Sequence, residues 1–435
     1  MTFRGVAGIV PPIGLLVLMG FVPRPTTAEP PATKATVPVS PPLPLTASER
    51  TRLEAEAAGQ SAEADRRFKE MDFAGALPLY RAERATRVRL GDKRYEAYAV
   101  RSEGCCLSAL GDAEAAIDRW LVAVEIDADR DDPGFVGYDW LLIGDAYNRL
   151  DRPHDAARAL DQAIPRLSQA IDQDHEADAR TMLARTLVNL GRPWEAVPHA
   201  SRAADLAERL DDESRRASAW LAAGLADASR GEHGLAVERF SDALRALESL
   251  DLPSEAASTL RVLGDSLAAL NHLPAAISMF QASRDAFKAL GNDLATAEVL
   301  DLLAAAQADS GALKEAIQTA RTAVDARREL RDGPGIVESL IRLAHYWSQN
   351  GDHLPSADTV AEALSTAPNG TTPAGRVRLL LLSASLERRA GRSDRARARL
   401  DEAQAIAEQQ DVAALRRLVE DARAFQGQDQ GRSRP

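Results

Sequence analysis

Histidine and aspartate are the residue types in this chain that could hold a metal, but their spacing fits no known site. Four of the seven histidines stand at turn signals, namely His154, His233, His272 and His353. A zinc site gathers its ligands at one point, and these turns are too far apart for that, except those of His233 and His272. His175-Glu176 is not followed by a second histidine four residues later, as a zincin helix requires. We therefore expect surface histidines and no metal.

Asp127, Asp129 and Asp131 resemble the start of a calcium-binding loop, because their oxygens alternate along the chain. Such a loop needs glycine at its sixth position and a bidentate glutamate at its twelfth. The chain has Asp132 and Tyr138 there, so we predict a polar turn.

The two cysteines, Cys105 and Cys106, are adjacent. A disulfide between helical neighbours would be strained, so we expect two free thiols that fill apolar space; a vicinal redox switch is the alternative. The sequence has no G-x-S-x-G elbow, P-loop or G-x-G-x-x-G fingerprint. It therefore predicts a protein that is not an enzyme and binds no cofactor.

The elements that would position any binding residue are set by a period of 40 residues, which divides the chain into nine units. One small residue marks each unit: Ala76, Ala116, Ala156, Ala196, Ala236, Ala276, Ala316, Ser356 and Ala396. A second stands 12 residues earlier: Ala64, Gly104, Gly144, Ala184, Gly224, Gly264, Ala304, Ala344 and Ala384. Such a period is typical of a solenoid, in which each unit covers the apolar face of its neighbour.

Turn signals split each unit into two helices, A and B. Seven residues after the earlier small position stand Met71, Gly111, Asp151, Gly191, Gly231, Asn271, Gly311, Gly351 and Gly391. Gly, Asn and Asp enter the left-handed conformation that ends helices. A second break follows about twenty residues later, as at Leu90-Gly91-Asp92 and Leu290-Gly291-Asn292.

Large apolar residues fill two further fixed places. Four before the A-helix small position stand Val100, Trp140, Trp220, Leu260, Leu300, Leu340 and Leu380, and four after the B-helix one stand Tyr80, Trp120, Leu160, Phe240, Phe280, Val360 and Leu400. The stripes give each helix one buried face. A bulky side chain at a small position would overpack the contact by roughly 1–3 kcal/mol.

This order of residues resembles the tetratricopeptide repeat, most fully in the third unit, with Trp140, Ile143, Gly144, Tyr147, Ala156, Leu160 and Ala163. The resemblance covers about 46–425 and implies an all-α, right-handed α-α superhelix of nine helix pairs plus a C-terminal capping helix. The 40-residue period is similar to that of kinesin light chains, bacterial peptide-sensing regulators and CHAT-associated arrays. Polar residues such as Gln60, Glu63 and Ser383 replace apolar ones in the terminal units, as solvent-facing caps require.

Charge and the N-terminal sequence bear on partners and compartment. The net charge of −12 argues against a nucleic-acid surface, because phosphate binding needs a positive field. Residues 1–28 read as a secretory signal with an apolar stretch at 5–22 and small residues before Glu29; an uncleaved membrane anchor is the alternative. Residues 29–45 read as a proline-rich linker and 426–435 as a disordered tail, so we expect an exported, periplasmic or extracellular protein.

In tetratricopeptide arrays helix A lines the concave side, so one face of helix A, called here the helix-A face, is predicted to bind a peptide or protein partner. Its candidate residues are Tyr98, Arg101, Tyr138, Leu141, Asp145, Arg185, Arg261 and Asp265. Tyr98, Arg101, Tyr138 and Arg185 should dominate the affinity, and their replacement by alanine should leave folding unaltered. Ordinary solvated helix faces are the alternative at these positions.

These features predict an exported, non-enzymatic scaffold for protein–protein interaction. Two alternatives remain open: a regulatory peptide sensor, and the stand-alone repeat array of a CHAT-type protease system. The chain has no segment with the His and Cys of a CHAT domain after its repeats.

Overall fold

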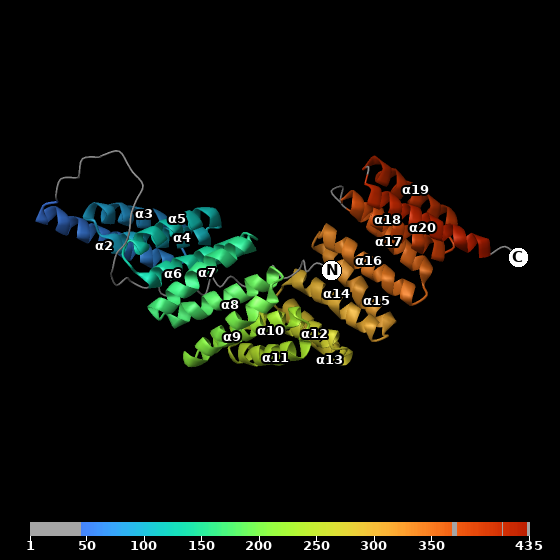
Figure 1. Ribbon diagram of the computed structural model, residues 1–435, viewed down its shortest axis with the longest axis horizontal. Coiled ribbons are helices and arrows are strands. Elements are labelled where there is room, and N and C mark those ends of the chain that lie inside the picture. Colours follow the sequence, from blue (N-terminus) through green and yellow to red (C-terminus); the bar gives the residue numbers. More distant parts are fainter. Residues whose placement is uncertain (1–44, 368–371, 411, 433–435) are drawn as a thin grey trace. The chain divides into compact units, whose positions relative to one another are not determined.

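The computed structural model describes residues 45–367, 372–410 and 412–432, and these form helices α2 to α20 with no strand. The chain divides into two compact units, Met1–Glu255 and Ala256–Pro435. Within each unit, helix pairs follow one another in chain order (Figure 1). The predicted all-α class and the nine pairs with a final covering helix are confirmed for the described residues.

The first unit contains repeats one to five. Its helices are α2 (Ala47–Lys69), α3 (Phe73–Leu90), α4 (Lys93–Ala109), α5 (Ala113–Ala128), α6 (Pro133–Arg149), α7 (Pro153–Ala170), α8 (Gln173–Asn189), α9 (Pro193–Arg209), α10 (Glu213–Ser229) and α11 (His233–Ser249).

The second unit contains repeats six to nine and the final helix. Its helices are α12 (Pro253–Ala269), which begins just before the boundary, α13 (Leu273–Ala289), α14 (Asp293–Asp309), α15 (Leu313–Glu329), α16 (Gly333–Gln349), α17 (His353–Thr366), α18 (Pro373–Arg389), α19 (Ser393–Gln409) and α20 (Ala413–Arg432).

Left-handed residues end the helices where the turn signals predict. All nine turn positions from Met71 to Gly391 have φ between 55° and 90°. The second break has the same conformation at Gly91, Asp131, Ile171, Asp211, Asp251, Gly291 and Arg331. An acidic residue then caps several A helices; for example, Asp92 accepts a bond from the Tyr95 amide at 3.3 Å.

The small positions are the places where helix A meets the large residue of helix B. A Cβ built on Gly104, Gly144, Gly224 or Gly264 would lie 2.5 to 2.7 Å from Trp120, Leu160, Phe240 or Phe280, respectively. Such a distance leaves no room for a side chain without a shift of the helix. The predicted packing of a large residue against a small one is therefore correct.

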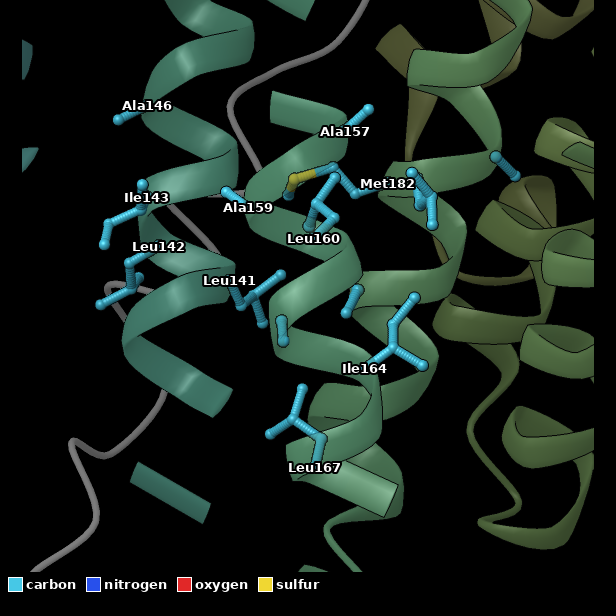
Figure 2. Close-up of a cluster of buried hydrophobic side chains, with 14 of the residues drawn as sticks. Leu141, Leu142, Ile143, Ala146, Ala157, Ala159, Leu160, Ile164, Leu167 and Met182 are labelled. Carbon is cyan, nitrogen blue, oxygen red and sulfur yellow. The ribbon is translucent and has the colours of Figure 1, made fainter. Parts of the chain in front are cut away.

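The apolar core runs between successive pairs inside each unit. Figure 2 shows Leu141 and Ile143 of α6, Leu160 and Leu167 of α7, and Met182 of α8 in one cluster of buried side chains. Because helix α8 covers the pair α6/α7 from the next repeat, no single repeat closes its own core.

The predicted end segments fare differently. The expected signal and linker, residues 1–28 and 29–45, lie outside the described residues apart from Leu45. The predicted boundary at 426 falls inside α20, which continues to Arg432, so a helix occupies part of the expected tail. None of the helices in the described ranges is both long and apolar enough to cross a membrane.

Candidate interaction surfaces

Four of the predicted partner-binding residues are buried in the first unit. Tyr98, Arg101, Tyr138 and Leu141 expose 5%, 0%, 3% and 2% of their surface. The expectation that they are accessible, and that alanine there leaves folding unaltered, is wrong. In this fold α4, α5 and α6 meet at these positions, so the side chains point into the joint between repeats two and three.

Arg101 is the centre of that joint. Its Nε lies 2.6 Å from Asp139 Oδ1 and its Nη2 lies 2.8 Å from Asp139 Oδ2, while Nη2 also donates to Asp127. The guanidinium stacks on the Phe135 ring at 4.5 Å. Arg130 pairs with the second oxygen of Asp127. A buried arginine tolerates the loss of water only when carboxylates satisfy it in this way, so Arg101 is a structural residue.

Protonation in the joint is governed by burial. Burial raises the pKa of Asp139 above its ordinary value, and the Arg101 charge opposes the rise. The carboxylate is held by that ion pair and is not free to bind another charged group.

The predicted tyrosines are likewise occupied. Tyr80 and Tyr98 both donate their hydroxyl hydrogens to Asp65, at 2.8 and 2.7 Å. The ring of Tyr138 packs edge-on against His175, with 4.6 Å between the ring centres. Neither tyrosine of the predicted set presents a free face.

A second joint, in the other unit, uses the same three positions 200 residues later. Arg327 Nη2 lies 2.9 Å from Asp301 Oδ2, and the Ser339 hydroxyl donates to the same carboxylate at 2.9 Å. Arg327 also pairs with Asp332. Positions 101, 127 and 139 thus have counterparts at 301, 327 and 339, with the arginine and the aspartate exchanged.

Three of the remaining predicted residues are paired within their own helix. Asp145 lies 3.4 Å from Arg149, and Arg261 lies 3.4 Å from Asp265. Desolvation raises the pKa of Asp145, and it raises that of Asp265 to about 6. These side chains are partly accessible, so they meet the solvent from the helix-A face of α6 and α12.

Arg185 is different, because it has no charged or hydrogen-bonding partner among the described residues. It lies on α8, 40 residues after Asp145, and is only partly exposed. Desolvation alone lowers its pKa to about 10. A cation in this condition favours any anion that reaches it, since the anion would restore the lost solvation.

The hollows of the surface lie beside the B helices instead. The larger, about 470 Å³, lies between α9, α10 and α11 and is lined by Ser201, Ala204, Asp205, Glu208, Arg216, Trp220 and Arg239. The other, about 410 Å³, lies between α15, α16 and α17, and its lining includes Arg321, Val324, Asp325, Arg328, Leu340, Trp347, Thr359 and Glu362. Six lining positions of the first recur 120 residues later in the second.

Metal and thiol chemistry find little support in the described part of the chain. No group of three or more His, Cys, Asp or Glu side chains there could hold a metal ion. Cys105 and Cys106 are free and buried, and burial raises the pKa of Cys105 to about 12. Both thiols are therefore protonated at neutral pH, as expected of apolar fillers.

No family model matches the chain, and no curated relative matches it. Among solved structures it is similar to a signal transduction ATPase with numerous domains from Pyrococcus horikoshii, described as having a tetratricopeptide repeat sensor. The identity is 12% and the TM-score 0.61, over 84% of this chain and 55% of that one. It is also similar to the apo form of RapI, at 14% identity and a TM-score of 0.51, over 62% of this chain and 97% of that one. The chain folds as a tetratricopeptide repeat array.

The charged joints of this array were missed by reasoning from sequence, although a signal for them exists. Opposite charges stand 26 residues apart at Arg101 and Asp127, and again at Asp301 and Arg327. In a 40-residue repeat that separation joins helix A to the end of its own helix B. The array's hollows left no comparable signal, because they depend on side-chain lengths.

Proposed function

We propose that this protein is an exported, non-enzymatic scaffold that binds a polypeptide partner on the helix-A face of its first unit. The single observation that carries the proposal is the unpaired, desolvated guanidinium of Arg185. Every other arginine singled out for this face is paired, Arg101 with aspartates and Arg261 with Asp265.

The partner group that fits Arg185 is a carboxylate. A planar guanidinium binds a carboxylate through two parallel hydrogen bonds, and the bond is stronger where water is partly excluded. Asp145 on α6, a helix that contacts α8, would disfavour a long acidic run beside the site. An isolated acidic side chain or a chain terminus, flanked by uncharged residues, suits the surface best.

Site-specific photo-crosslinking tests this placement. A photoreactive amino acid at Asn148, on the helix-A face of α6, should form adducts with one partner, whereas the same group at Arg158 on helix α7 should not. The partner identified by mass spectrometry is then titrated calorimetrically against Arg185→Ala and Arg185→Lys. We expect at least a tenfold loss for alanine, about 1.4 kcal/mol, and a smaller loss for lysine.

Unchanged affinity in a well-folded Arg185→Ala protein, or adducts formed only from position 158, would contradict the proposal. Export is tested separately, because it concerns another segment. The mature protein should begin at or near Glu29, and mass spectrometry that finds Met1 or Thr2 retained on most molecules would exclude cleavage.

A sensor is the alternative function. It gains support from the Pyrococcus horikoshii neighbour, whose repeats are described as a sensor. A sensor would change the accessibility of distant repeats when its ligand binds, while a scaffold would not. Hydrogen exchange with and without the identified partner distinguishes the two.

A further inference from the structure

The hollow beside Trp220, on the helix-B side of the first unit, has charges that the fold does not satisfy. Asp205 and Glu208 project from α9 one turn apart and line this hollow. Neither carboxylate has an ion pair or hydrogen bond with any residue in the described ranges. Unpaired carboxylates beside a concave surface leave it with a negative potential.

The two arginines of the hollow do not cancel that charge, because each is already paired with another acid. Arg216 Nη2 lies 3.0 Å from Glu213 Oε1, and Arg239 Nε lies 2.7 Å from Asp227 Oδ2. With those partners counted, the neighbourhood of the hollow has two more negative than positive side chains. An anion would therefore meet repulsion here, and a cation attraction.

Trp220 adds an aromatic surface to the carboxylates. Its indole lines the hollow and is only partly buried. Arg216 lies 5.3 Å from the ring centre, which is within the range at which a cation is attracted to an indole face. The ring in this fold already holds one guanidinium, so its environment is suited to that chemical group.

The hollow in the second unit shows what a satisfied version of the same place looks like. There Asp325 and Glu362 both pair with Arg328, and Asp358 pairs with Arg392. Trp347 lines that hollow, with Arg321 4.8 Å from its ring centre. The two hollows share size, position and an Arg–Trp contact, and differ in whether their carboxylates are free.

We infer that the hollow beside Trp220 binds an arginine or lysine side chain of a partner polypeptide, with Asp205 and Glu208 as its counter-charges. The volume of about 470 Å³ accommodates one long basic side chain with part of its backbone. This site lies on α9, α10 and α11 and does not involve Arg185, so it is independent of the proposed helix-A contact. A partner that uses both would present an acidic group to one face and a basic group to the other.

The test uses the full chain and two blocked peptides of defined sequence, acetyl-Gly-Arg-Gly-Arg-Gly-amide and its glutamate counterpart. The chain has five tryptophans, so indole 15N–1H spectra give one signal per ring, with Trp220 and Trp347 assigned by Trp220→Phe and Trp347→Phe. We expect the arginine peptide to shift the Trp220 signal to saturation and to leave Trp347 unmoved. The glutamate peptide should move neither.

Two double variants complete the experiment. Asp205→Asn with Glu208→Gln should weaken binding of the arginine peptide at least tenfold, whereas the matched pair Asp325→Asn with Glu362→Gln should not change it. Arg185→Ala should also leave it unchanged, which separates this site from the proposed function. The inference is overturned by a silent Trp220 signal, by an equal shift with the glutamate peptide, or by full affinity in the Asp205/Glu208 variant.

Discussion

The joints around Arg101 and Asp301 occupy the same three places in two separate units, yet their charges are exchanged. In the first, a central arginine on helix A holds two aspartates; in the second, a central aspartate on helix A holds an arginine and a serine. The backbone period therefore decides where side chains meet, and the charge assignment is free as long as each joint is satisfied within itself.

The first repeat contains a third version. Arg87 stands in the place of Asp127 and Arg327 and pairs with Asp92, the counterpart of Asp132 and Asp332. Its other partner is Glu83, 3.3 Å away, at a place where most repeats have alanine. The acid has thus moved one turn along helix B, so a satisfied joint does not require its acid at one fixed position.

The largest effect should come from breaking the first joint. Arg101→Met leaves Asp127 and Asp139 buried without their shared cation, and we expect a loss of roughly 3–5 kcal/mol in the free energy of unfolding. Because repeats couple chiefly to their neighbours, hydrogen exchange should increase in α4 to α6 and stay unchanged in the second unit. Equal loss of protection in both units would contradict the separation of the joints.

Transplanting the second joint into the first sharpens the comparison. Arg101→Asp, Asp127→Arg and Asp139→Ser copy residues 301, 327 and 339, and Arg130→Leu copies Leu330, which removes a like charge beside the new arginine. We expect this fourfold variant to recover at least half of the stability lost in Arg101→Met. If it unfolds as readily as the single variant, the surroundings of the two joints are not equivalent.

The joint of the first repeat should make stability depend on pH. Burial raises the pKa of Glu83 to about 7, and Arg87 opposes the rise. Between pH 4.5 and 7 the folded state then binds a proton that the unfolded state has released, so stability falls as pH rises through this window. The loss should reach about 3 kcal/mol above pH 7. Denaturation at a series of pH values should show this slope in the parent and a flatter one in Glu83→Gln.

The apolar contacts, in contrast to the charged joints, are alike in both units. Gly224 faces Phe240 in the first unit and Gly264 faces Phe280 in the second, at nearly equal distances. Gly224→Leu and Gly264→Leu should each destabilise by roughly 1–3 kcal/mol. Gly59→Ala is the control, since a Cβ there meets nothing within 4 Å. Full protection of α10 and α11 in Gly224→Leu would show that the helix contact is wrong.

The helix pairs were predictable because one ladder of positions repeats without a gap. Met71 is a poor turn residue by its type, yet its place in the ladder correctly predicted φ of 60°. The burial of Arg101 was not predictable by the same route. Its position faces the solvent in the usual 34-residue pattern, and only the geometry of the longer B helix brings Asp127 and Asp139 to it. The pairing of Arg101, and the lack of a partner for Arg185, therefore required coordinates.

The smallest effect concerns the turns beside the two charged joints. Asp131 and Arg331 occupy equivalent left-handed positions, with φ of 51° and 56°. Both are exposed, so substitution removes no burial. The left-handed region costs most residues about 1–2 kcal/mol, but aspartate tolerates it better. Glycine avoids that cost, although it makes the unfolded chain more flexible by about 0.4–1 kcal/mol. Arg331→Gly should therefore stabilise its unit by about 1 kcal/mol, while Asp131→Gly should be neutral or slightly destabilising. Urea denaturation of the two variants measures the difference, and an equal response would mean that residue type at this turn does not distinguish the joints.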